Sequence, residues 1–118
     1  MLARFTQIDY DREIALVAMS ESQSTERMLG VARVICERNM KHAEFAVVVG
    51  DPWQGKGIGA ALLQRCISIA KERGIEKVMG TVLAENTQML ALGKKLGFNI
   101  KKVSGAGEFD LSIEFRKN

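Results

Sequence analysis

A glycine-rich stretch at residues 51–60, with the sequence DPWQGKGIGA, constrains this 118-residue chain more than any other segment. The residues before it, 43–49, are apolar and rich in β-branched side chains, which is typical of a buried strand. After it, apolar residues recur at helical spacing to about residue 73, and Gly74 favours a helix end there. The glycines therefore lie where a strand leads into a helix, so the backbone can turn tightly and a ligand can approach it closely.

A helix start of this kind predicts a phosphate site. The first amides of a helix have no partners within it, and the helix dipole is positive at that end. Phosphate groups bind at such places. We therefore predict that a pyrophosphate lies on the amides of Gly55, Lys56, Gly57, Ile58, Gly59 and Ala60. The alternative is that each glycine serves only the turn.

Two familiar phosphate-binding loops fit this stretch poorly. The P-loop requires Ser or Thr after its Gly-Lys pair, and here Gly57-Ile58 follows Lys56. The dinucleotide pattern G-x-G-x-x-G/A is matched by Gly55, Gly57 and Ala60, but residues 51–54 separate these glycines from the strand. The antiparallel strands expected upstream also disagree with a doubly wound sheet.

Composition indicates one soluble globular domain. Hydrophobic residues make up 47% of the chain and charged residues 26%, and no apolar run is long enough to span a membrane. A net charge of +3 is too weak to indicate nucleic-acid binding. Cys36 and Cys66 lie in apolar patterns without a CxxC motif or a neighbouring histidine. We expect small buried side chains in a reducing, cytoplasmic protein, and neither a disulfide nor a metal site.

The order of expected elements is β-β-β-α-β-α-β-β. Strands at 14–19, 28–37 and 43–49 are joined by short polar turns and predict an antiparallel meander. A helix at 57–73 then crosses over to a strand at 77–85 that lies parallel to the third strand. A second helix runs from Asn86 or Thr87 to Leu96, and a hairpin of 98–103 with 108–115 follows. Residues 1–12 show no clear period. From the order of the other elements we predict one α/β (α+β) domain with a mixed, mostly antiparallel sheet.

The pattern Gln/Arg-x-x-Gly-x-Gly/Ala is met by Gln54, Gly57 and Gly59. Here the sequence resembles the GNAT superfamily of N-acetyltransferases, which use acetyl-CoA. The strand at 43–49, Asn86 and the segment Leu96-Gly97-Phe98 are similar to that family in the same order, so the resemblance extends across the chain. Residues 3–13 also look like one subgroup, the protein lysine acetyltransferases in which a GNAT domain follows an acyl-CoA-synthetase-like region.

The resemblance implies acetyl-CoA as acyl donor, without a metal. The whole chain, 1–118, would be a single acetyltransferase domain that is truncated at its N-terminus and lacks the usual first strand and first helix of the fold. The backbone of Val47, Val48 and Val49 would pair with the pantetheine arm, provided that this strand splays away from the strand at 77–85. Asn86 would either bind the same arm or only cap the second helix.

Glu44 is the candidate catalytic residue. An amine attacks a thioester only when it is neutral, so a base or a water chain must remove its proton. Glu44 matches the position of the general base in the family's histone and protein lysine acetyltransferases, and burial of such a carboxylate raises its pKa. The alternative is an ordinary exposed glutamate. Many members of the family place a tyrosine at the position of Gly93 to protonate the leaving thiolate, and the one tyrosine, Tyr10, lies elsewhere, so the general acid is left open.

We therefore expect an N-acetyltransferase whose acceptor is a lysine of another protein, for example an acyl-CoA synthetase. Two alternatives stay open: a non-catalytic acyl-CoA-binding module and a small-molecule amine acetyltransferase. Without the first strand, the edge of the strand at 14–19 would be exposed and would favour a homodimer through that edge. The alternative is that residues 1–12 fold back over the gap and the chain stays monomeric.

Overall fold

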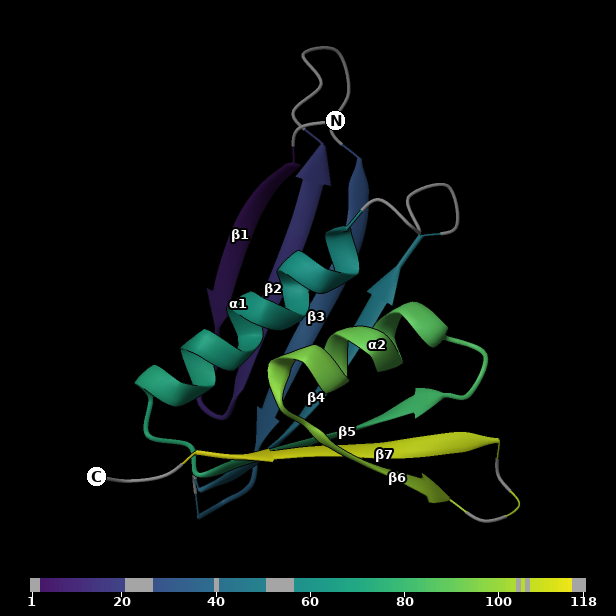
Figure 1. The fold of residues 1–118 in the computed structure, drawn as a ribbon. Coiled ribbons are helices and arrows are strands. Elements are labelled where there is room, and N and C mark those ends of the chain that lie inside the picture. Colours follow the sequence, from purple (N-terminus) through teal and green to yellow (C-terminus); the bar gives the residue numbers. More distant parts are fainter. Residues whose placement is uncertain are drawn as a thin grey trace.

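In a computed structural model, the chain forms one mixed sheet with two helices on the same face (Figure 1). The structure describes residues 3–20, 27–39, 41–50, 57–103, 105 and 107–115. Within them the elements are β1 (Ala3–Asp9), β2 (Glu13–Ser20), β3 (Met28–Cys36), β4 (His42–Val49), α1 (Ile58–Glu72), β5 (Lys77–Leu83), α2 (Thr87–Leu96), β6 (Asn99–Val103) and β7 (Glu108–Glu114). The strand order across the sheet is β1-β2-β3-β4-β5-β7-β6.

The sheet consists of two antiparallel parts that meet at one short parallel ladder. Strands β1 to β4 form an antiparallel meander, and β5, β7 and β6 form the second part. Between them, β4 pairs with β5 only over His42–Glu44 and Lys77–Met79. Beyond these residues the two strands diverge (Figure 1). The splay expected between the third and fourth predicted strands is therefore present.

The predicted fold class is confirmed, and one strand must be added to the predicted order. Residues 3–9 form β1, which pairs along the full length of β2, so the order is β-β-β-β-α-β-α-β-β. The edge expected to be bare is covered, and the chain passes from β1 to β2 through residues 10–12 without a helix. Of β1, only Ala3 and Phe5 pack on the core, so its sequence lacks the apolar alternation that predicts a strand.

In addition to its pairing with β2, β1 contacts α1 and the C-cap residue of that helix through two side-chain interactions. The guanidinium carbon of Arg65 lies 4.2 Å from the centre of the Phe5 ring, and Arg73 Nη2 lies 3.1 Å from Asp9 Oδ1. A hydrogen bond from Gln7 and the nearby Arg73 guanidinium lower the pKa of the Asp9 carboxyl. Tertiary contacts therefore hold a strand that local propensity does not predict.

The core lies between α1 and the helix-facing side of β2, β3 and β4. Alternate residues of these strands point toward α1, and Leu16, Ala32 and Val34 are fully or almost fully buried there. From α1, the buried side chains are Ile58, Leu62, Leu63, Cys66 and Ala70. Each buried leucine contributes about 1.5–3 kcal/mol through removal of apolar surface from water. This packing fixes the start of α1 next to the end of β4.

Candidate functional site

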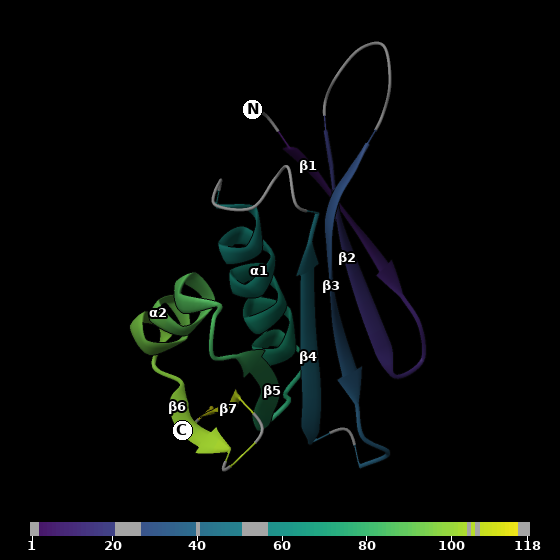
Figure 2. The same cartoon turned by 90° about the vertical axis from the view of Figure 1, so that its right-hand side faces the viewer.

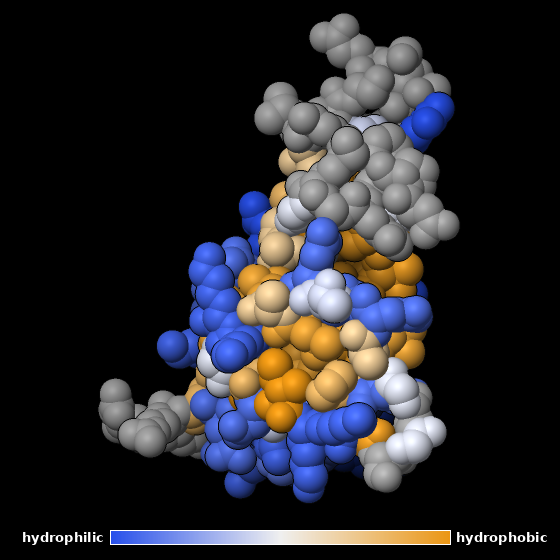
Figure 3. All heavy atoms as spheres, turned by 45° about the vertical axis from the view of Figure 1, so that its right-hand side comes forward, coloured by the Kyte–Doolittle hydropathy of each residue, from blue (hydrophilic) through white to orange (hydrophobic). Residues whose placement is uncertain are grey.

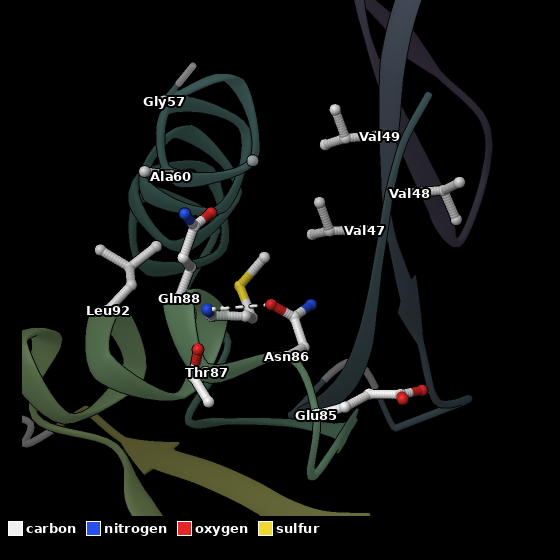
Figure 4. Close-up of a pocket in the computed structure, with 12 residues that line it drawn as sticks. Val47, Val48, Val49, Gly57, Ala60, Glu85, Asn86, Thr87, Gln88 and Leu92 are labelled. Carbon is white, nitrogen blue, oxygen red and sulfur yellow. Dashed lines mark hydrogen bonds between the residues drawn. The ribbon is translucent and has the colours of Figure 1, made fainter. Parts of the chain in front are cut away.

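A cavity of about 730 Å³ opens where β4 and β5 diverge (Figure 4). Three walls surround it: the last residues of β4, the first turn of α1 and the start of α2. Seen from a view between those of Figures 1 and 2, apolar side chains gather in the middle of this side of the molecule and charged ones border them (Figure 3). The residues that line the cavity are Val47, Val48, Val49, Gly57, Gly59, Ala60, Glu85, Asn86, Thr87, Gln88, Met89 and Leu92.

The first turn of α1 offers uncapped backbone amides to the cavity. Gly57 has a left-handed backbone with φ of 82°, and the first bond within the helix runs from the Ala61 N–H to the Gly57 carbonyl. The amides of Ile58, Gly59 and Ala60 therefore precede any intrahelical acceptor. No side chain in the described part of the chain caps this turn, and the turn contains no acidic residue. The positive end of the helix dipole is thus available to an anion.

Gly59 keeps the cavity open. A Cβ at this position would lie 3.4 Å from Val49 Cγ2 on β4 and 3.4 Å from Met89 Cε on α2. A larger side chain would therefore fill the space between the three walls. The close backbone approach predicted from the glycine spacing is possible at this position.

The β4 wall presents both side chains and backbone. Val47 and Val49 point toward α1, whereas Val48 points to the opposite face of the sheet (Figure 4). On the side that faces β5, the ladder ends at Glu44, so the described chain supplies no strand partner there from Phe45 to Val48. An amide-rich ligand can pair with such a strand edge.

At the start of α2, Asn86 acts as a helix cap. Its Oδ1 accepts a hydrogen bond of 3.1 Å from the Met89 N–H, so the side chain caps α2 (Figure 4). Its side-chain amide nitrogen points toward β4 and has no partner among the described residues, so it can still donate to a ligand. Sequence reasoning missed the other cavity residues here, Glu85, Thr87, Gln88, Met89 and Leu92. The predicted strand-helix-strand crossover could have located these residues, because it makes β5 parallel to β4 and so places the residues that follow β5 on the same side as those that follow β4.

Glu44 lies outside this cavity. In β4, Ala43 and Phe45 are buried under the helices, while Glu44 is exposed on the other face of the sheet. The burial expected for this carboxylate is therefore not found. Glu44 pairs with Met79 in the last rung of the β4–β5 ladder, so it lies at the point where the strands separate.

At the position where the family pattern has a tyrosine, a side chain would displace Leu111. Gly93 is buried in α2, and a Cβ on it would lie 2.6 Å from Leu111 Cδ2. Tyr10 is exposed on the loop between β1 and β2. The described cavity residues include no tyrosine, histidine or cysteine, and Glu85 is the titratable side chain among them.

Other sequence predictions have mixed outcomes. Cys36 and Cys66 are buried and free, as expected, and burial raises the pKa of both thiols. The described residues contain no cluster of three His, Cys, Asp or Glu side chains that could hold a metal ion. No described helix is both long and apolar enough to cross a membrane. Gln54, Gly55 and Lys56 lie outside the described residues.

Comparison with known proteins places this geometry in a family. The acetyltransferase (GNAT) family model matches residues 2–98. The acetyltransferase PA5475 of Pseudomonas aeruginosa is 31% identical over 100 residues, which cover 83% of this chain and 53% of that protein. The chain thus spans about half the length of this relative.

Two further relatives differ in the acceptor that their names state. The histone acetyltransferase TAP1 of Glycine max is 28% identical over 67% of this chain and 33% of its own length. The L-methionine sulfoximine/L-methionine sulfone acetyltransferase of Pseudomonas aeruginosa is 35% identical over 48% of this chain and 33% of its own length. Among solved structures, the yncA protein of Salmonella typhimurium with its cofactor acetyl-CoA aligns with a TM-score of 0.73 at 21% identity, over 90% of this chain and 66% of that one.

Proposed function

We propose that this chain, which belongs to the acetyltransferase (GNAT) family, moves an acetyl group from acetyl-CoA to the amine of a protein lysine. The observation that carries the proposal is the cavity between the diverging strands, with the uncapped first turn of α1 at one wall. The first turn of α1 suits an anionic part of a ligand, and the open edge of β4 suits an amide-rich part of the same ligand. Coenzyme A has both, since a pyrophosphate and an amide-containing arm are joined in it.

The donor would lie across the cavity from α1 to β4. The amides of Ile58, Gly59 and Ala60 would donate to the pyrophosphate. Gln54, Gly55 and Lys56, which precede them in the sequence, would bind it as well. The arm would then pass Val49 and follow the open edge of β4 at Val48 and Val47 toward Glu44. The side-chain nitrogen of Asn86 points at the same edge and would donate to a carbonyl of the arm. This path brings the thioester to the point where β4 and β5 separate.

The acceptor would approach from the opposite face of the sheet. Glu44 is exposed on that face, beside the last rung of the ladder. A neutral amine attacks the thioester carbonyl carbon, the C–S bond breaks, and the amine proton passes to Glu44 directly or through water. The departing thiolate takes a proton from water, because Gly93 provides no acid. Glu44 needs no deep burial for this role if the bound acceptor excludes water around it.

A protein lysine suits this geometry because the acceptor face is open. No described helix covers the sheet around Glu44, so a small amine would find few enclosing contacts there. A lysine side chain brings the rest of its protein as additional contact surface. The relative named as a histone acetyltransferase supports the same acceptor class.

A second candidate is acetylation of a small amine, which the relative named for methionine sulfoximine favours. The third is a module that binds acyl-CoA without transferring the acyl group, which the glycine at the expected tyrosine position favours. The three functions differ in which added amine triggers thiol release.

Thiol release from acetyl-CoA tests all three. The purified chain is incubated with acetyl-CoA alone, with a lysine-containing peptide and with methionine sulfoximine, and free CoA thiol is measured over time. Release that depends on the peptide supports the proposal, and release that depends on the small amine favours the second candidate. Binding of CoA without release in any mixture would make the chain a binding module, and absence of CoA binding by calorimetry would overturn all three.

A further inference from the structure

An aromatic ring stands at the end of the cavity where β4 and β5 come together. Figure 2 shows both helices on one side of β4, and on that side the strand presents Val49, Val47 and Phe45 in order toward the β5 ladder. Val49 and Val47 line the cavity, whereas Phe45 is only 4% exposed and comes next along the strand. The side chain that follows the cavity wall is therefore part of the core.

The Phe45 ring spans the gap between the two strands. Phe45 and Gly80 are the first residues after the last pair of the ladder, which joins Glu44 to Met79. A Cβ on Gly80 would lie 2.6 Å from Phe45 Cδ2 and would overlap Cε2 and Cζ of the same ring. The ring thus reaches from β4 to the backbone of β5, and it closes the helix side of the gap at the point where pairing ends.

Neighbouring core side chains hold the ring in this position. Phe98, which follows α2, meets the Phe45 ring edge-on, with ring centres 5.7 Å apart and an angle of 69° between the planes. Leu111 of β7 pairs with Gly80 and is 1% exposed. Phe45, Phe98 and Leu111 belong to the same buried cluster. Because protein cores are close-packed, the ring cannot move aside for a ligand without disturbing this cluster.

We propose that Phe45 limits the length of the acyl group that this chain binds. The inference rests on the proposed function, in which the arm of CoA follows β4 and brings the thioester to the point where the strands separate. At that point the helix side of the gap is closed by the Phe45 ring, and the opposite side is left open for the amine. An acetyl group adds only a methyl to the carbonyl carbon and ends short of the ring, whereas a butyryl group adds a propyl chain.

A longer acyl chain therefore gains no affinity from its added methylene groups. Toward the helices the chain would meet the Phe45 ring, and toward the open face it would stay in water and take the place of the attacking amine. Removal of the ring changes this, because the propyl chain can then be buried in the space that the ring leaves. Burial of two more methylene groups raises an affinity by about tenfold.

Calorimetric titration with CoA, acetyl-CoA and butyryl-CoA tests the proposal without an acceptor. The wild-type chain is expected to bind butyryl-CoA no more tightly than acetyl-CoA. In Phe45→Ala the affinity for butyryl-CoA relative to acetyl-CoA should rise by about tenfold. The matched control is Phe5→Ala, since Phe5 also packs on the core but lies on β1 at the far edge of the sheet. Loss of core packing alone would change the affinity for all three ligands alike, so the ratio in the control should equal that of the wild type.

Circular dichroism and urea unfolding show whether the variants stay folded, and Phe45→Val, which removes less of the core, is the second probe in case Phe45→Ala does not fold. A wild-type chain that binds none of the three ligands would overturn the proposed function and this inference with it. If CoA and acetyl-CoA bind, three results would overturn the inference alone. These are a wild-type chain that binds butyryl-CoA more tightly than acetyl-CoA, a ratio that neither Phe45 variant raises, and a ratio that Phe5→Ala raises equally.

Discussion

The ring of Phe45 lies against Gly80 at the rung where β4 and β5 stop pairing. The ladder joins Ala43 to Val78 and Glu44 to Met79, and Phe45 and Gly80 are the next residues of each strand. A Cβ on Gly80 would overlap the Phe45 ring, which also meets Phe98 edge-on with ring centres 5.7 Å apart. The ring thus occupies the space of a side chain at position 80, and the cavity opens immediately beyond it.

Substitution of Gly80 by alanine is expected to destabilise the fold. The added methyl group must displace a ring that is packed in the core, and overpacking of this kind costs about 1–3 kcal/mol. Urea unfolding followed by circular dichroism measures the loss. In a Phe45→Leu background the same substitution should cost less, because the ring that it meets is gone. An equal cost in both backgrounds would show that Phe45 is not what requires glycine at this position.

Local sequence signals predicted the elements that surround the site. The capping residue Asn86 and the left-handed Gly97 mark the ends of α2, and the apolar period of α1 marks its buried face. These signals work because each depends on residues close together in the chain. The splay of β4 from β5 was expected only through the family resemblance, since no local signal encodes it.

Long-range contacts explain what the sequence did not reveal. β1 has only two side chains in the core, and its pairing with β2 and its contacts with α1 hold it in place. The orientation of Glu44 was hidden for a different reason. Ala46 and Val48 share its exposed face, so the apolar run at 43–49 shows no alternation although the strand has one covered face and one open face.

Substitution of Gly59 by leucine is expected to abolish CoA binding. The new side chain would fill the gap between Val49 and Met89, while the helix itself gains about 0.8–1 kcal/mol of intrinsic propensity. Isothermal titration calorimetry with CoA measures the affinity, and thermal unfolding checks the fold. Gln64→Leu, on the exposed side of the same helix, is the control and should bind CoA as the wild type does. Unchanged affinity in the Gly59 variant would rule out this cavity as the CoA site.

Substitution of Glu44 by glutamine is expected to slow acetyl transfer while CoA affinity stays the same. Loss of a general base costs about 10²–10⁴-fold in rate. The defect should be largest at lower pH, where the acceptor lysine is protonated and most needs a base. The measurement is the pH profile of thiol release with a lysine peptide, with Glu114→Gln as a control at an exposed carboxylate on β7. A Glu44 variant with the wild-type rate and profile would leave this residue as an ordinary surface glutamate.

The buried thiol of Cys66 is expected to make stability fall at alkaline pH. Cys66 is 1% exposed on the inner face of α1, and burial raises its pKa from 9.0 to about 12. Between these values the unfolded chain has lost the thiol proton and the folded chain has kept it, so rising pH favours unfolding. The contribution of Cys66 is full below pH 9, and at pH 10 it has fallen by about 1.4 kcal/mol.

Cys66→Val isolates this effect, because lysines, Tyr10 and Cys36 titrate equally in both proteins. Urea unfolding at pH 7 and pH 10 gives the free energy of unfolding of each. The wild type should lose about 1.4 kcal/mol more than the variant over this interval. The native thiol should also resist a soluble disulfide reagent until the chain unfolds, because only the thiolate reacts. Equal losses in both proteins, or fast labelling of Cys66 in the native state, would show that the thiol is not held protonated in the core.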